Sequence, residues 1–121
     1  MQQILFSNPV FKPGLNFTVR LGEKWKDKLR IGDFVEIEGF DGIGRIRKIY
    51  VCKLAEISQE VLENEHDPQC RKWESLVEVL RQVYPELQNK SGEEIEEVTV
   101  TCIGFWLYKR YKDRTLLQKS D

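Results

Sequence analysis

The side chains best suited to binding a ligand are concentrated in one short stretch of the sequence. Arginine offers a planar fork of donors that fits a phosphate or the acceptor edge of a base, and a threonine hydroxyl can donate or accept a hydrogen bond. A tryptophan can stack on a base, which contributes about 1–3 kcal/mol per base. All three types occur among several lysines between residues 18 and 30, as Thr18, Arg20, Lys24, Trp25, Lys26, Lys28 and Arg30. The pattern predicts a ligand cleft around Thr18 and Arg20.

A structural role for the same residues is the alternative interpretation. Trp25 would then pack over one end of the fold, and Arg20 would pair with a glutamate such as Glu38. Because strand side chains repeat every two residues, Thr18 and Arg20 share one face of an expected strand. The alternation does not indicate whether that face lines a cavity.

Further basic and aromatic residues indicate contact with phosphates or bases. Alternation along "IGRIRKIYVCKL" predicts one face with Ile43, Arg45, Arg47, Ile49 and Val51, and the other with Gly44, Ile46, Lys48, Tyr50 and Cys52. Arg45 and Arg47 are therefore expected to emerge together on one face. They join the lysines of the first stretch as candidates for sequence-independent phosphate contacts. Aromatic residues also alternate with lysines in "FWLYKRYK", residues 105–112, where Tyr108 and Tyr111 are the expected exposed rings.

The formal net charge of −1 hides an uneven distribution along the chain. Counting Lys and Arg against Asp and Glu gives +4 for residues 12–53, −8 for residues 54–97 and +3 for residues 98–121. If the first and last of these segments are neighbours in the fold, one face is basic. The alternative is that strands and a helical insert simply carry their charges outward.

Enzymatic motifs are sparse. The sequence has no GxSxG, no phosphate-binding loop and no dinucleotide fingerprint. Three widely spaced cysteines and one histidine predict neither a disulfide framework nor a metal site, and we expect no cofactor. His66, in the acidic run "ENEHDP", is expected at the surface. Glu63 and Glu65 could supply a carboxylate to the cleft if the helix that carries them lies over it.

Length and composition describe one globular domain, residues 1–121. The chain is 40% hydrophobic and 32% charged, which is typical of a folded soluble domain of this size. No apolar run approaches the roughly 20 residues of a membrane-spanning helix, and the N-terminus lacks the pattern of a secretory signal. We therefore expect a cytoplasmic protein without a membrane partner.

The hydrophobic pattern predicts about five strands with two helices inserted before the last. Strands are expected in "QILFS", "NFTVRL", "IGDFVEIEGF" and "IGRIRKIYVCKL", and the strongest in "VTVTCIGFWLYK", residues 98–109, which is apolar on both faces and therefore central. Ser58 and Asp67-Pro68 are helix start signals. Residues 86–97 are interpreted as a mobile acidic loop and 108–121 as a basic tail. Together these elements predict a small α+β fold with a mostly antiparallel barrel of five to six strands.

The order of these motifs resembles the ASCH domain, a branch of the PUA-like β-barrel superfamily. The resemblance covers about residues 12–107 and runs through "GLNFTVRLGEKW", "IGDFVEIE", "IGRIRKIYVCKL", "LRQVYPEL" and "VTVTCIGFWL". It implies a barrel with a cleft between strands and helices that binds RNA or a nucleotide-like ligand. Thr18 and Arg20 match the Thr-x-Arg positions of the family.

Some proteins of that family resemble small amidohydrolases that deacylate acetylated cytidine with a lysine, a threonine and a glutamate. Here the lysine position falls on Leu15 or Asn16, and the glutamate position falls near Gln69 or Cys70. Only Thr18 matches the implied catalytic set. The main hypothesis is therefore an RNA- or nucleotide-binding domain. A nucleoside-directed amidohydrolase is the second hypothesis, and a protein-interaction module that uses the acidic insert is the third.

Overall fold

The fold is built on one curved sheet. The computed structural model describes residues 1–109, and in this part of the chain five strands form a sheet in the order β1-β3-β4-β5-β2. Strands β1 and β3 pair in parallel, whereas the other three pairings are antiparallel. The strands are β1 (Gln3–Ile4), β2 (Leu15–Leu21), β3 (Phe34–Ile37), β4 (Gly42–Lys53) and β5 (Thr99–Lys109). The predicted α+β class and mostly antiparallel sheet are confirmed, and β5 is interior.

Most of the helical residues lie between β4 and β5. The α-helices of the described residues are α1 (Trp25–Lys28), α2 (Gln59–Glu63), α3 (Trp73–Val83) and α4 (Gly92–Glu96), with 3-10 turns η1 (Leu54–Glu56), η2 (Pro68–Cys70) and η3 (Pro85–Leu87). Helix α2 begins at its predicted cap, because the Ser58 hydroxyl accepts a hydrogen bond from the backbone of Val61. The other predicted cap, Asp67, begins η2, while α3 itself starts at Trp73.

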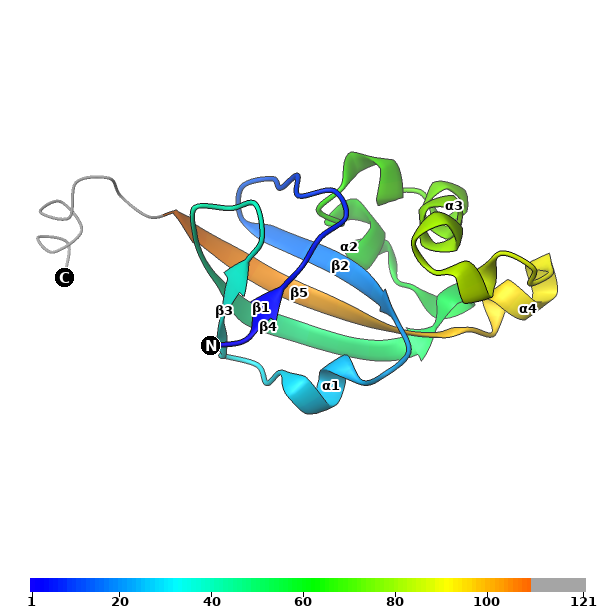
Figure 1. Cartoon of the computed structure of the whole chain (residues 1–121), viewed down its shortest axis with the longest axis horizontal. Coiled ribbons are helices and arrows are strands. Elements are labelled where there is room, and N and C mark those ends of the chain that lie inside the picture. The colour runs from blue at the N-terminus through cyan, green and yellow to red at the C-terminus, as the bar shows by residue number, and fades with distance from the viewer. Residues whose placement is uncertain (110–121) are drawn as a thin grey trace, which may run out of the picture.

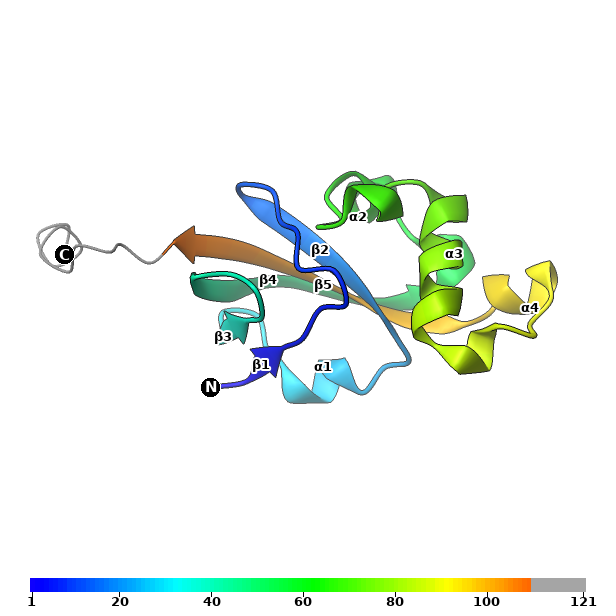
Figure 2. The ribbon, with the colours of Figure 1, turned by 45° about the horizontal axis from the view of Figure 1, so that its top comes forward.

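Two hydrophobic clusters lie on the two faces of the sheet. The first joins one face of β2 and β5 to the helices after β4, through Phe17, Val19, Val61, Leu76, Leu80, Ile95, Val100 and Cys102. The second fills the concave side, where β1, β3 and α1 fold over β4 and β5, and contains Ile4, Phe6, Leu29, Val35, Ile37, Ile46, Ile103 and Phe105. Figures 1 and 2 place α2, α3 and α4 over one half of the sheet and β1 and β3 at the other.

The alternation predicted along β4 is wrong beyond Arg47. Strand β4 advances from Ile46 to Lys48 while its partner β5 advances by one residue, so Arg47 is the extra residue of a β-bulge. Every later residue of β4 therefore lies on the face opposite to the predicted one. Ile49 packs with Ile46 in the second cluster instead of sharing the face of Arg45.

The acidic segment 86–97 is more ordered than predicted. It contains η3 and α4, and α4 has a capping box in which the Ser91 hydroxyl accepts from the Glu94 N–H while the Glu94 carboxylate accepts from the Ser91 N–H. Ile95 is buried in the first cluster. The mobile-loop interpretation is therefore wrong, and the Ser-x-x-Glu spacing is the local signal for this helix.

The described strands form an open sheet with β1 and β2 at its edges. Residues 108 and 109 of the predicted tail belong to β5, whereas residues 110–121, including Tyr111, lie outside the described part of the chain. Within residues 1–109, every helix is too short or too polar to cross a membrane.

Candidate functional site

A pocket of about 330 Å³ opens beside the edge strand β2. This volume lies at the lower end of the range of about 300–1,000 Å³ that is usual for small-ligand sites. Its walls come from residues 5–8, from β2, from the connection between α2 and η2, and from α3. The polar and charged residues of its lining include Asn8, Thr18, Arg20, Glu38, Glu65, His66, Asp67 and Tyr84.

Backbone hydrogen bonds hold the connection after α2 against β2. The Phe17 N–H donates to the Asn64 carbonyl at 2.6 Å, and the Phe17 carbonyl accepts from the His66 N–H at 2.8 Å. Phe17 and Glu65 form an isolated parallel bridge. The connection therefore covers part of the exposed edge of β2 and places Glu65 beside Thr18.

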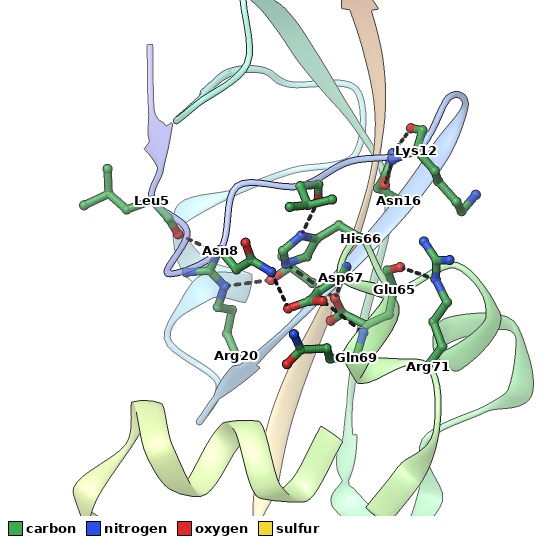
Figure 3. A network of polar contacts seen from close by, with 12 residues as sticks. Leu5, Asn8, Lys12, Asn16, Arg20, Glu65, His66, Asp67, Gln69 and Arg71 are labelled. Atoms are coloured by element: carbon green, nitrogen blue, oxygen red, sulfur yellow. Dashed lines mark hydrogen bonds and ion pairs between the residues drawn. The ribbon is translucent and has the colours of Figure 1, made fainter. Parts of the chain in front are cut away.

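Arg20 and Thr18 form one wall of the pocket. The Arg20 Nε donates to Thr18 Oγ1 at 3.0 Å, and its Nη2 donates to the Leu5 carbonyl at 2.7 Å (Figure 3). These bonds use two of the five N–H groups of a guanidinium, which leaves three without a hydrogen-bond partner among residues 1–109. Because the Thr18 oxygen accepts from Arg20, its own hydrogen is available to a ligand. The Phe6 ring centroid, 4.8 Å from Arg20 Cζ, supports the charged group from one side.

Glu65 is the most perturbed carboxyl group of the site. Glu65 is 2% exposed, and this burial raises the pKa of its carboxyl group to about 8. Backbone hydrogen bonds from Asp67 and Val19 and the positive charge of Arg20 act in the opposite direction and lower the pKa. Glu65 is therefore largely protonated at neutral pH and can donate a hydrogen bond. The His66 Nε2 lies 3.4 Å from Glu65 Oε1.

Two side chains fasten the N-terminal segment over the pocket. The His66 Nδ1 lies 2.8 Å from the Val10 carbonyl, and the Asn8 Nδ2 donates to Asp67 Oδ2 at 2.9 Å (Figure 3). Asp67 also caps η2 by accepting from the Gln69 N–H. The prediction that His66 is a surface residue is wrong, since it is 7% exposed. Burial lowers its pKa, so the imidazole is neutral at pH 7.

The structure brings together only part of the predicted binding set. Thr18 and Arg20 share the pocket, but Trp25 is half-buried outside it, with the Arg20 Cζ 5.8 Å from its ring. Glu38, the alternative partner of Arg20, lines the same pocket and accepts from the Phe6 N–H. The other predicted phosphate contacts are exposed and lie outside the pocket lining. Lys26 and Lys28 lie on α1, Lys24 directly precedes that helix, and Arg45 and Arg47 lie on β4.

Sequence reasoning named one of the four polar residues that complete this site. Of the two glutamates considered for the cleft, Glu65 lies in it, whereas Glu63 is exposed and accepts from Gln59. His66 and Asp67 were missed as site residues, because an acidic run beside a helix start is typical of a solvated surface. Asn8 was missed because its contact with Asp67 spans 59 residues of sequence. The Asp-Pro pair was the available signal, since a cap residue often lies where a chain turns into the fold.

The positions that the resemblance assigns to a lysine hold no basic group. The Asn16 side chain accepts from the Lys12 N–H and donates to the Lys12 carbonyl, which secures the turn before β2, while Leu15 packs against the first cluster. Of the two positions near the implied glutamate, Cys70 lines the pocket, and burial raises the pKa of its thiol to about 12. No group of three His, Cys, Asp or Glu side chains within the described residues suits a metal ion.

Comparison with known proteins identifies the fold but no family. No family model matches the chain, and no curated protein matches it significantly. Among solved structures, the hypothetical protein PH0355 is 21% identical with a TM-score of 0.55, over 77% of this chain and 82% of its own. The protein PF0455 from Pyrococcus furiosus is 22% identical with a TM-score of 0.53, over 78% and 82%. At this identity the likeness extends to the fold alone.

Proposed function

We propose that this chain is an ASCH-type, PUA-like domain that binds RNA or a nucleotide-like ligand in the pocket containing Thr18 and Arg20. The observation that carries the proposal is the Arg20 guanidinium, which two hydrogen bonds hold at the pocket wall while three N–H groups remain for a ligand. We also propose that the sheet closes toward the barrel of that superfamily. The hydrogen bond from Arg20 to the Leu5 carbonyl supports this closure, because Arg20 lies on one edge strand, β2, and Leu5 directly follows the other edge strand, β1.

The lining suits a flat ring with a polar edge better than a free phosphate. Arg20 is accompanied in the pocket by the carboxyl groups of Asp67 and Glu38, so the site is not purely cationic. The Thr18 hydroxyl and the protonated Glu65 add donors, and the Phe6 ring and the α3 residues Leu76, Leu80 and Val83 add apolar walls. A nucleobase combines an apolar face with donors and acceptors at its edge, and it therefore matches this lining.

Loss of Arg20 should remove most of the affinity for nucleotides. We expect isothermal titration with the four ribonucleoside monophosphates to detect binding of at least one by the wild-type protein. Arg20→Ala should weaken it by about 10- to 100-fold, since hydrogen bonds to a charged group contribute about 1.5–3 kcal/mol. Arg30→Ala removes an exposed arginine outside the pocket and should leave the affinity unchanged. Equal affinities of the wild-type protein and Arg20→Ala would contradict the proposal.

An amidohydrolase acting on an acylated nucleoside is the second candidate, and one observation favours it. The pocket places the Glu65 carboxyl, with its pKa raised to about 8, beside the Thr18 hydroxyl, and a carboxyl group that titrates near neutral pH suits general acid–base catalysis. If the protein is such an enzyme, it should convert N4-acetylcytidine to cytidine, and Glu65→Gln should lower the rate by at least about 100-fold. The absence of cytidine after prolonged incubation, measured by chromatography, would exclude this activity.

A further inference from the structure

A second group of aromatic and basic side chains lies on the sheet, away from the pocket. Phe34 on β3 is opposite Arg45 on β4, Arg45 is opposite Trp106 on β5, and Trp106 is opposite Leu15 on β2. Residues paired across antiparallel strands share a face, so these four side chains form one row across the sheet. Phe34 is 50% exposed and Trp106 is 40% exposed. Helices α2–α4 lie over the half of the sheet farther from the C-terminal end of β5 (Figure 1).

The arginines of this row contact the aromatic rings, and the Arg45 Nε also donates to the Gly32 carbonyl at 3.3 Å. The Arg45 Cζ lies 5.2 Å from the centroid of the Phe34 ring, and the Arg47 Cζ lies 5.8 Å from that of Trp106. The β-bulge at Arg47 accounts for this arrangement. Arg47 is the unpaired residue of the bulge, and it lies next to the position where Arg45 pairs with Trp106. Tyr108, 41% exposed, continues the same face by alternation along β5.

The row is positively charged, and few acidic side chains lie on the same face to neutralise it. Neither Arg45 nor Arg47 forms a salt bridge within residues 1–109, and the only acidic residue that alternation places on this side of β3 is Glu36. Asp41 lies in the adjoining hairpin between β3 and β4. Lys48, the next basic residue on this face, forms a salt bridge with Glu60, which neutralises its charge.

We infer that this row, which we call the sheet platform (Phe34, Arg45, Arg47, Trp106 and Tyr108), binds single-stranded RNA. Unpaired bases stack on exposed aromatic rings, and arginine guanidinium groups contact the phosphates that join those bases. The platform offers both kinds of side chain. A duplex hides the faces of its bases and would not fit. The inference rests on the proposed function in that both sites take RNA. The platform, however, is a separate site with its own residues.

The platform and the side chains of Thr18 and Arg20 lie on opposite faces of the sheet. Trp106 is opposite Leu15, whereas Thr18 lies three residues further along β2. That is about 10 Å along the strand, and the odd separation places the Thr18 side chain on the other face. An RNA strand on the platform would have to pass around the edge of β2 to place a base in the pocket, and the platform is therefore a separate site.

Fluorescence polarisation with a labelled oligouridine tests the inference. A length of about 12 nucleotides lies within the usual site sizes of single-strand-binding domains. Trp106→Ala should weaken binding by at least about fivefold. Arg45→Ala/Arg47→Ala, which alters only exposed side chains, should weaken it too and should reduce its salt dependence. Two phosphate contacts predict about a sevenfold loss of wild-type affinity between 50 and 200 mM salt. Lys72→Ala/Lys90→Ala removes two charges beside α3 and α4, outside both the platform and the pocket, and should have little effect. A blunt duplex of the same length should compete poorly.

The outcomes separate this inference from the proposed function. Unchanged RNA affinity in both platform variants would overturn the inference, even if Arg20→Ala still abolished binding of mononucleotides. Weakened RNA binding by the platform variants, with mononucleotide binding intact, would support it. A dimer in solution that Trp106→Ala dissociates would also overturn it, because the rings would then be covered by a second copy of the chain.

Discussion

Glu65→Gln should make the stability of the protein far less dependent on pH. Burial raises the pKa of Glu65 from an ordinary value of 4.5 to about 8 in the folded state, so between these values the folded state binds more protons than the unfolded state. Stability attributable to this group is therefore full below about pH 4.5 and is lost as the pH rises through 8. Each pH unit in that window removes up to about 1.4 kcal/mol of stability, which amounts to about 5 kcal/mol over the whole window. Glutamine is neutral throughout and avoids this loss.

Urea unfolding at pH 5, 6.5 and 8.5 measures the effect as a difference between the two proteins. The free energy of unfolding of Glu65→Gln, relative to wild type, should rise by several kcal/mol between pH 5 and 8.5. His66 and other titrating groups are present in both proteins and largely cancel in this difference. Glu63→Gln is the matched control, because Glu63 is exposed two residues away, and its curve should run parallel to that of wild type. A parallel curve for Glu65→Gln would mean that Glu65 is ionised in the folded protein.

Phe17→Ala should be the most destabilising of the simple truncations in β2. The Phe17 side chain is fully buried in the first cluster, its ring is stacked with Tyr50 at 5.9 Å between centroids, and it lies over Gly104, where an added Cβ would come within 2.9 Å of the ring. Truncation of a buried phenylalanine costs about 3–5 kcal/mol. Because the Phe17 backbone also pairs with the connection that carries Glu65, the pocket should loosen together with the core.

Phe34→Ala provides the control of the same residue type. Phe34 is half-exposed on β3 and contacts Arg45, so its loss should cost below about 1 kcal/mol. Denaturant unfolding followed by circular dichroism measures both variants. If Phe17→Ala cost no more than Phe34→Ala, the packing of β2 against the helices would not be as the structure describes.

Local patterns predicted the elements but not the pairings that build the site. The apolar run of residues 98–109 marked β5 as interior because both of its faces are buried, and strand periodicity placed Thr18 and Arg20 on one face. The bulge at Arg47 carries no such signal, since its position depends on how β4 meets Gly104 of the neighbouring strand. A one-residue insertion inverts every later side chain, which explains the error at Ile49.

The buried acidic corner of the pocket was the hardest part to predict. Glu65 and His66 are polar residues in a polar run, and their burial depends on backbone pairing with Phe17, which lies far away in the sequence. His66 further depends on the Val10 carbonyl. Such long-range contacts leave no trace in local hydrophobicity, so a solvated surface was the natural expectation for this run.

The central claim is that the pocket beside β2 binds a nucleotide, and an NMR titration tests it most directly. Amide resonances of 15N-labelled protein would be followed as each ribonucleoside monophosphate is added to about 5 mM, which would detect even a millimolar Kd. We predict that the largest shifts fall on Thr18, Val19 and Arg20 and on the connection from Glu65 to Asp67, and that they disappear in Arg20→Ala. The absence of shifts, or shifts confined to residues outside this pocket, would contradict the claim.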